Sequence, residues 1–254
     1  MPSAKDLKPD TTFLRVFAIG DFGTGKSVFA STFPTPGYVF DFDKGIEIYS
    51  GMEWEYDQFP SSAPGWVEFE TKFREVKDKA MKGEYKTVVI DSTTTLTDMA
   101  MERAMQLDPK RSATGGPLWN VHYQHVRNLM EPKLRAFTNW PCNLVMIAHL
   151  QVVQDQETGA ILSIEPLLTG QLSQRVPGYF GEVYTFFTKR TDKGVQYLMR
   201  TVPFGHYKAR SRLSGPKRML HDEIPNHYDA IRKSYEVKQE ELNKKKEGST
   251  NKDN

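Results

Sequence analysis

The sequence of 254 residues has only one cysteine, Cys142, and no long apolar run. A single cysteine cannot form an internal disulfide, which is typical of proteins in a reducing compartment. No stretch approaches the roughly 18 consecutive apolar residues that cross a bilayer, and the mean hydropathy is -0.57. Residues 1–10 are polar where a secretory signal would be apolar. We therefore expect a cytoplasmic protein with no membrane partner.

An excess of charge of one sign is also lacking. Lysine and arginine together number 34, aspartate and glutamate number 32, and the net charge is +2. This balance gives no indication of a nucleic-acid partner, so any such interpretation depends on where the cations lie. The hydrophobic content of 38% over this length is enough for the core of one ordinary α/β domain.

Four short apolar runs predict buried strands. None shows the alternation of a half-exposed strand, which favours a parallel sheet covered on both faces. The runs are 13–19, 37–42, 86–91 and 143–148. Segments with helical spacing of apolar residues separate them, and these are 25–33, 66–81, 95–107 and 121–137. The order βαβαβααβ predicts an α/β fold with a mainly parallel sheet flanked by helices.

The chain after residue 148 shows a different pattern, with pairs of apolar segments around turn residues. Residues 151–154 and 160–164 flank a DQETG turn, and 182–188 and 195–201 flank DKG, which predicts hairpins. We expect these strands to extend the sheet antiparallel. The end of the chain is highly charged with few aliphatic side chains, which predicts a short exposed helix that frays into disorder. The predicted organisation is an N-terminal extension (1–12), one core domain (13–232) and a charged tail (233–254).

Residues 20–27 read GDFGTGKS, which fits the pattern G-x-x-x-x-G-K-[ST] between a predicted strand and a predicted helix. The glycines let the backbone turn tightly and aim N–H groups at phosphates. Lys26 is expected to bridge the β- and γ-phosphates, and Ser27 to bind Mg²⁺ through its hydroxyl. The predicted core has no N-K-x-D guanine reader, which favours ATP. The residues assigned to the nucleotide are Gly20, Asp21, Phe22, Gly23, Thr24, Gly25, Lys26, Ser27 and Val28.

Carboxylates end two of the predicted strands. Asp91 follows VVI and is the candidate second partner of the magnesium ion. The alternative is that Asp91 caps the following turn and helix, and the two roles are compatible. Asp41 and Asp43 alternate at the end of YVFDFD, so both point to the same side. Asp43 lies further past the strand and is the candidate to orient an attacking water, against the alternative of a solvated turn residue.

With these motifs in this order, residues 13–213 resemble the RecA-like core ATPases, and specifically the phage-encoded RecA-like single-strand annealing recombinases. The resemblance rests on GDFGTGKS, YVFDFDKG, VVIDS, VMIAHLQ, LSQRVPGYFGEVYTF and YLMRTVPFGHYKARSR. It implies a RecA-like P-loop NTPase core that binds ATP with Mg²⁺ and hydrolyses it. It also implies a protein of the host cytoplasm.

The resemblance also implies roles for single residues. Asp43 matches the carboxylate that polarises water, a position often occupied by glutamate. His149, at the end of the fourth strand, matches a polar residue that senses the γ-phosphate; the alternative is a strand-end histidine satisfied by a backbone carbonyl. RecA-like proteins act as rings or filaments, in which a neighbour supplies cations to the γ-phosphate. Lys208 and Arg210 match these cations and imply a homo-oligomer with active sites at subunit interfaces; the alternative is a solvated charged strand end.

Two loops resemble in position the DNA-facing loops of RecA-like cores. The candidate DNA-binding residues are Lys110, Arg111, Gln171 and Arg175. A basic stretch with interleaved aromatic residues, from Lys189 to Arg218, can also track a phosphate backbone, or it can form a subunit interface. The resemblance implies that the protein binds single-stranded DNA and promotes annealing or strand exchange in phage recombination.

Further partners and functions stay open. A single-strand-binding protein is a candidate partner. One alternative is a nucleotide-gated binding module with little hydrolysis that recruits replication or recombination proteins. Another is a small-molecule P-loop kinase, although no compact arginine-rich lid is evident between the fourth strand and the hairpin.

Overall fold

The computed structural model of the protein describes residues 12–213, 220–234 and 236. The expected N-terminal extension and most of the expected charged tail lie outside these residues, as do Lys217 and Arg218 of the basic stretch. In this part of the chain, no helix is both long enough and apolar enough to span a bilayer.

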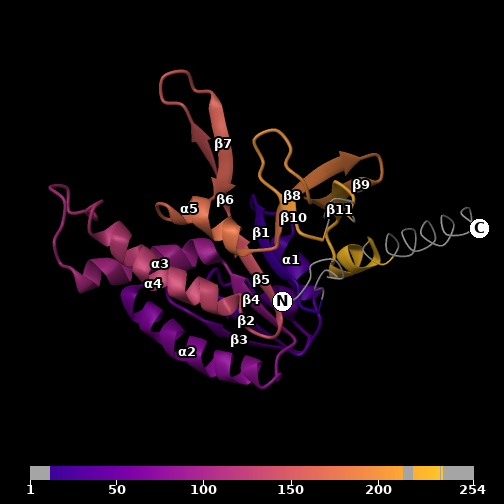
Figure 1. Ribbon diagram of the computed structural model, residues 1–254, viewed down its shortest axis with the longest axis horizontal. Coiled ribbons are helices and arrows are strands. Elements are labelled where there is room, and N and C mark those ends of the chain that lie inside the picture. Colours follow the sequence, from indigo (N-terminus) through magenta and orange to yellow (C-terminus); the bar gives the residue numbers. More distant parts are fainter. Residues whose placement is uncertain (1–11, 214–219, 235, 237–254) are drawn as a thin grey trace, which may run out of the picture.

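A mainly parallel sheet forms the centre of the molecule (Figure 1). Over the described residues its order is β11-β9-β8-β1-β5-β4-β2-β3, with β10 paired to β8. The parallel strands are β1 (Arg15–Gly20), β2 (Gly37–Asp41), β3 (Trp54–Gln58), β4 (Thr87–Asp91), β5 (Asn143–Ala148) and β8 (Glu182–Thr191). The predicted fold class and the four predicted strands are therefore confirmed.

The sequence-based prediction of the remaining strands is wrong in three respects. The edge strand β3 was not predicted, because its residues WEYDQ are mostly exposed and carry no apolar run. Strand β8 pairs parallel with β1 as well as antiparallel with its hairpin partner β9 (Gly194–Arg200). In the same sheet, β10 (Arg210–Ser211) pairs antiparallel with β8, and β11 (Glu223–Pro225) pairs antiparallel with β9. The hairpin of β6 (Leu150–Gln154) and β7 (Ile161–Pro166) forms a separate sheet that projects from the body (Figure 1).

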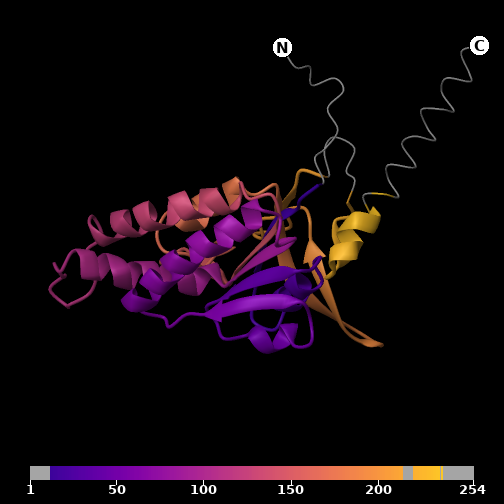
Figure 2. The same cartoon turned by 90° about the horizontal axis from the view of Figure 1, so that it is seen from below.

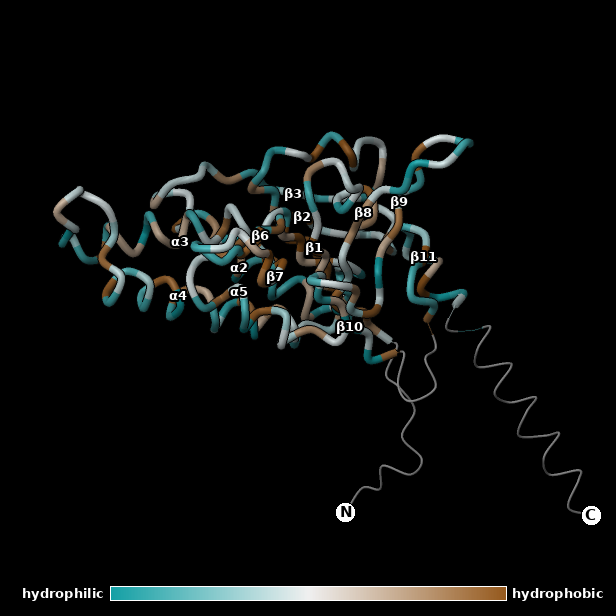
Figure 3. Tube along the Cα trace, turned by 90° about the horizontal axis from the view of Figure 1, so that it is seen from above, coloured by the Kyte–Doolittle hydropathy of each residue, from teal (hydrophilic) through white to brown (hydrophobic). Residues whose placement is uncertain are grey.

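Helices cover both faces of the sheet and produce two cores. On one face pack α2 (Ala63–Met81), α3 (Thr93–Leu107) and α4 (His122–Phe137), which lie together in Figure 2. The short helix α1 (Lys26–Ser31) and the 3₁₀ helix η2 (Ile46–Tyr49) contribute to the core on the other face. Alternate residues of each central strand enter opposite cores, as the period of a strand requires. In Figure 3 much of the hydrophobic colour lies along the strands around β1.

Local sequence explains where two of these helices begin. The Ser62 hydroxyl accepts a hydrogen bond from Gly65 N ahead of α2, and the Ser92 hydroxyl accepts one from Thr95 N ahead of α3. Serine is a preferred residue at this position because its oxygen satisfies a free backbone N–H. The short helix α5 (Leu172–Arg175) and the 3₁₀ helix η3 (Val176–Tyr179) connect the hairpin to β8.

An aromatic cluster under α2 gives a test of this packing. Phe69 is fully buried and its ring contacts those of Phe40, Phe42 and Phe59. Replacing Phe69 with alanine should lower the free energy of unfolding by about 3–5 kcal/mol, because it leaves a cavity. Val67→Ala, on the exposed side of the same helix, should change it by less than about 0.5 kcal/mol. Urea denaturation measures both, and equal effects would contradict the described core.

Candidate functional site

The loop between β1 and α1 folds around the side chain of Lys26. Its Nζ donates hydrogen bonds to the carbonyl oxygens of Gly20, at 2.9 Å, and Asp21, at 2.7 Å. Gly23 and Gly25 have backbone φ values of 70° and 82°, which residues with a Cβ rarely adopt. The loop thus has the turned backbone that the GDFGTGKS pattern predicts.

Lys26 is a buried cation among carboxylates. Burial lowers the pKa of its ammonium group, because low polarity disfavours the charged form. The charges of Asp91, Asp21 and Asp43 act in the opposite direction and favour the protonated form. The charge of the loop therefore depends on carboxylates contributed by two other parts of the chain.

Ser27 and Asp91 meet beside Lys26. The Ser27 hydroxyl donates to Asp91 Oδ2 at 2.6 Å, so the two residues expected to hold a metal are brought together. The pKa of Asp91 is raised to about 6, chiefly by burial; the charges of Asp43 and Asp41 add to this rise, and the hydrogen bond from Ser27 opposes it. Hydroxyl and carboxylate oxygens are ligands that suit Mg²⁺. The residue that caps the N-terminus of α3 is Ser92. Asp91 therefore does not have the alternative role of helix cap.

Asp43 and His149 form a second pair at the carboxyl edge of the sheet. His149 Nε2 lies 3.1 Å from Asp43 Oδ2, and the Thr95 hydroxyl donates to Asp43 Oδ1. Burial would raise the pKa of Asp43, but hydrogen bonds from His149, Thr95 and Ser92 outweigh it and hold the pKa below its usual value. Asp43 is therefore an ionised carboxylate. His149 bonds to this carboxylate through its ring, which differs from the alternative of a histidine satisfied by a carbonyl.

Phe22 covers this pair from the tip of the loop. Its side chain is 77% exposed, and its ring centroid lies 4.4 Å from that of His149. The backbone N–H of His149 donates to Thr94 Oγ1 at 3.0 Å, which fixes the start of the segment after β5. The other ring nitrogen, Nδ1, is buried and has no hydrogen-bond partner.

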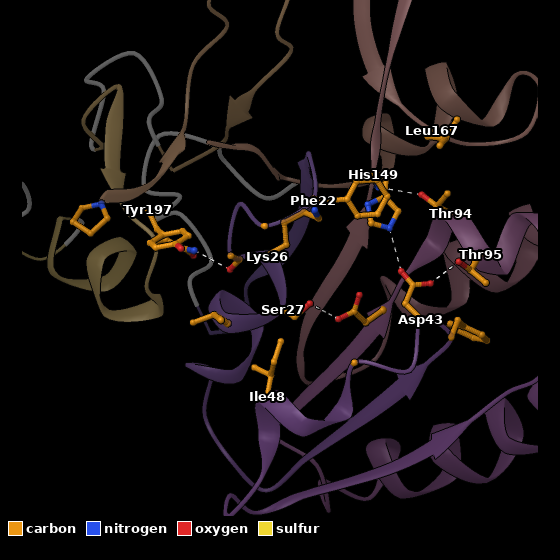
Figure 4. A pocket seen from close by; sticks show the side chains of 18 residues that line it. Phe22, Lys26, Ser27, Asp43, Ile48, Thr94, Thr95, His149, Leu167 and Tyr197 are labelled. Carbon is orange, nitrogen blue, oxygen red and sulfur yellow. Dashed lines mark hydrogen bonds and ion pairs between the residues drawn. The ribbon is translucent and has the colours of Figure 1, made fainter. Parts of the chain in front are cut away.

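A cleft of about 1030 Å³ joins these groups (Figure 4). Asp43, His149 and Leu167 line it on one side of Lys26, and Tyr197 lies on the other side. Pro225 and Asn226 complete the wall beside Tyr197. These C-terminal residues were not predicted as part of the site, because nothing in their local pattern links them to a loop about two hundred positions earlier.

The C-terminal wall of the cleft also makes a hydrogen bond to the loop between β1 and α1. Asn226 Nδ2 donates to the Gly25 carbonyl oxygen at 2.8 Å. A Cβ at Gly25 would lie 2.5 Å from that nitrogen and 3.1 Å from Tyr197 Cδ1, so only glycine permits this approach. Tyr228 N donates to Thr32 Oγ1 at 2.9 Å. This bond holds the helical residues 228–234 against the end of α1.

The two predicted neighbour-supplied cations do not line the cleft of their own chain. Lys208 Nζ pairs with Glu165 Oε1 of β7 at 2.7 Å. Arg210 donates to the carbonyl oxygens of Pro177 and Phe180. Their role toward a neighbouring subunit stays a prediction, and Arg210 would have to leave these carbonyls to perform it.

The predicted DNA-binding residues are in part engaged within the chain. Arg111 donates to the carbonyl oxygens of Met105, Asp108 and Lys110 in its own loop, and Arg175 pairs with Glu131 at 2.7 Å. Lys110 is exposed, and Gln171 lines a second, smaller cavity.

The geometry can be compared with known proteins. The family model described as an AAA domain matches residues 12–213. A KaiC-like protein of the archaeon Pyrococcus horikoshii has a solved structure that is 11% identical, with 84% of each chain covered and a TM-score of 0.45. None of the curated proteins matches the sequence.

Burial of Asp91 predicts a stability effect in the absence of nucleotide and metal. Asp91→Asn should raise the free energy of unfolding at neutral pH by on the order of 3 kcal/mol, because it removes a carboxylate whose pKa is raised. The gain should be complete above about pH 6, where Asp91 is ionised in the folded protein. It should vanish below about pH 4, where the group is protonated in both states.

Urea denaturation at a series of pH values measures this difference. Asp78→Asn, on the exposed side of α2, is the matched control and should have little effect at any pH. A loss of stability in Asp91→Asn at pH 8, or a gain that is independent of pH, would contradict the burial effect.

Proposed function

Because this chain belongs to the AAA-domain family over residues 12–213, we propose that its cleft binds ATP with Mg²⁺, hydrolyses it, and couples this reaction to single-stranded DNA. The observation that carries the proposal is the convergence of Lys26, Ser27, Asp91 and Asp43 on one cleft. These residues come from the start of α1 and from the ends of two strands that are far apart in the sequence. Their chemistry matches that of phosphoryl transfer, which requires positioning and neutralisation of charge.

Each residue has a distinct task under this proposal. Lys26 binds the phosphates with the charge that the surrounding carboxylates maintain. Ser27 and Asp91 hold the magnesium ion, which when bound neutralises charge on the phosphate oxygens. Asp43 is ionised and can accept a hydrogen bond from the attacking water, and so orients it. His149, bonded to Asp43, lies where it can respond to the γ-phosphate.

The opposite side of the cleft suits the base of the nucleotide. Tyr197 is 49% exposed beside Gly25, and Pro225 lies on the neighbouring strand β11. An aromatic face and a proline ring give a planar base an apolar surface on which to stack. With the phosphates over Lys26 and the γ-phosphate toward Asp43, the base is directed to Tyr197.

The DNA and assembly parts of the proposal rest on the position of loops and cations. Single-stranded DNA binds at the loops that carry Lys110 and Gln171, and subunits assemble as a ring or filament in which Lys208 and Arg210 reach a neighbour's cleft. The proposed role is annealing or strand exchange in phage recombination, with a single-strand-binding protein as a further partner.

A second candidate function is favoured by one observation. Both oxygens of Asp43 already accept hydrogen bonds, from Thr95 and His149, and aspartate is shorter than the glutamate often found at this position. Such a carboxylate has less capacity to orient water. The protein would then be a nucleotide-gated binding module with little hydrolysis that recruits replication or recombination proteins.

ATP turnover with and without a single-stranded oligonucleotide at low salt tests the proposal. Turnover by the wild-type protein should rise with DNA, and Lys26→Ala should abolish turnover under both conditions because the phosphates lose their cation. Lys82→Ala removes an exposed lysine at the end of α2 and should leave turnover unchanged. Wild-type turnover that DNA does not alter would contradict the DNA coupling.

Asp43→Asn distinguishes the ATPase from the gated module. It should leave binding of a non-hydrolysable ATP analogue nearly unchanged but lower turnover by roughly 100-fold or more, the usual effect of losing a general base. Isothermal titration calorimetry and steady-state kinetics measure the two quantities. Equal turnover in the wild type and Asp43→Asn would contradict the assigned role and favour the gated module.

A further inference from the structure

A second cavity of about 240 Å³ lies between the start of α4 and the residues that lead into α5. Trp119 and Tyr123 line one part of it, and Gly170 and Gln171 another. Its volume is below the roughly 300–1,000 Å³ of pockets for drug-sized ligands, which limits an occupant to about the size of one nucleobase. The cavity brings together two loops that the sequence analysis considered separately.

Trp119 presents its indole to solvent at the mouth of this cavity. It is 70% exposed, whereas Trp66 and Trp140 are buried. Its ring centroid lies 4.4 Å from that of Tyr123, so two aromatic rings form one wall. The exposed indole is therefore available to stack with a planar group that enters the cavity.

The wall is held in place by the buried His122. Leu118 N donates to His122 Nδ1 at 2.7 Å, so the proton of the neutral ring is on Nε2. Nε2 donates to the Asp108 carbonyl oxygen at 2.9 Å. One histidine therefore connects both ends of the loop that precedes Trp119, and the indole projects from a fixed segment.

Polar groups complete the cavity. Asn120 and Gln171 line it with side-chain amides, which carry both donors and acceptors. Arg127 also lines the cavity. Its charge helps to lower the pKa of Glu131, the carboxylate that pairs with Arg175. Gly170 has a φ of 62°, and a Cβ there would lie 3.1 Å from Tyr123 Cδ1, so the backbone approaches the ring closely.

The second cavity is connected to the ATP cleft by a short segment. Leu167 lines the cleft, and residues 169–172 line the second cavity. Leu167 N donates to the His149 carbonyl oxygen at 2.8 Å, and His149 is the residue bonded to Asp43. A displacement of Asp43 or His149 can therefore be passed through Leu167 to Gly170 and Gln171.

We propose that the second cavity binds one base of single-stranded DNA, stacked on Trp119, with its edge toward the amides of Asn120 and Gln171. Arg127 attracts the adjoining phosphate. The inference rests on the proposed function, and it moves the principal contact from Arg111 and Arg175, which are engaged within the chain, to an aromatic wall. Aromatic stacking with a nearby cation is the chemistry by which proteins bind single strands without reading their sequence.

Titration with an oligothymidylate of about 20 nucleotides, longer than a typical single-strand site, tests the proposal at low salt. Tryptophan fluorescence of the full-length protein should be quenched on binding, because a base covers the exposed indole. Trp119→Ala should weaken binding by roughly 10-fold or more, the range for loss of one base–aromatic stack, whereas Trp119→Phe should retain most of the affinity. Tyr56→Ala, which removes an exposed aromatic side chain on the edge strand β3, is the matched control.

The outcomes separate this inference from the proposed function. Tight binding by both the wild type and Trp119→Ala would overturn the stacking site and leave DNA binding intact. No binding by the wild type would overturn both. A loss of binding in Trp119→Ala that Trp119→Phe does not restore would also overturn the stacking role, since an aromatic ring alone should suffice. Unchanged ATP affinity in Trp119→Ala shows that the variant is folded.

Discussion

The buried ammonium group of Lys26 is the charge around which the carboxyl edge of the sheet is organised. Burial disfavours this charge, and it persists because two loop carbonyls accept its hydrogen bonds and three aspartates surround it. Two of those aspartates, Asp91 and Asp43, repel one another, and the charge of Lys26 opposes the resulting rise in the pKa of Asp91. The loop and the strand ends therefore stabilise each other's charge, and neither arrangement is favourable alone. Under the proposed function, phosphates and a divalent ion bind at this cluster.

The parallel sheet is what brings these charges to one edge. Carboxyl ends of parallel strands meet on the same side, so Asp41 of β2 lies beside Asp91 of β4 in register. Strand β5 runs between β1 and β4 and places His149 next to the loop of β1. Cores on both faces keep the central strands fixed. Tyr197 of the antiparallel strand β9 and Asn226, which follows β11, then close the far side of the cleft.

Much of the fold and the grouping of Lys26, Ser27 and Asp91 was predictable from sequence, because each depends on local pattern. Uninterrupted apolar runs identified the buried strands, and GDFGTGKS and VVID identified Lys26, Ser27 and Asp91. Strand β3 was missed because an edge strand needs no apolar run. Tyr197 and Asn226 were missed because their contact with Gly25 is set by sheet order, which local pattern does not encode. The hydrogen-bond partners of Arg111 and Arg175 could not be predicted either. A long arginine side chain can bond to any of several nearby carbonyl or carboxylate groups, and the sequence does not say which one it meets.

His149 connects the Asp43 end of the cleft to the segment leading to the second cavity, because its ring bonds to Asp43 and its carbonyl oxygen accepts from Leu167 N. The measurement that tests it most directly is hydrogen exchange of the Leu167 amide, which bonds to the His149 carbonyl. It should be compared between the protein with Mg²⁺ and ADP and the protein with Mg²⁺ and a non-hydrolysable ATP analogue. We expect the γ-phosphate to change the protection of this amide and of residues 169–172, and to leave the edge strand β3 unaffected. Equal protection of these residues in the two nucleotide states would contradict it.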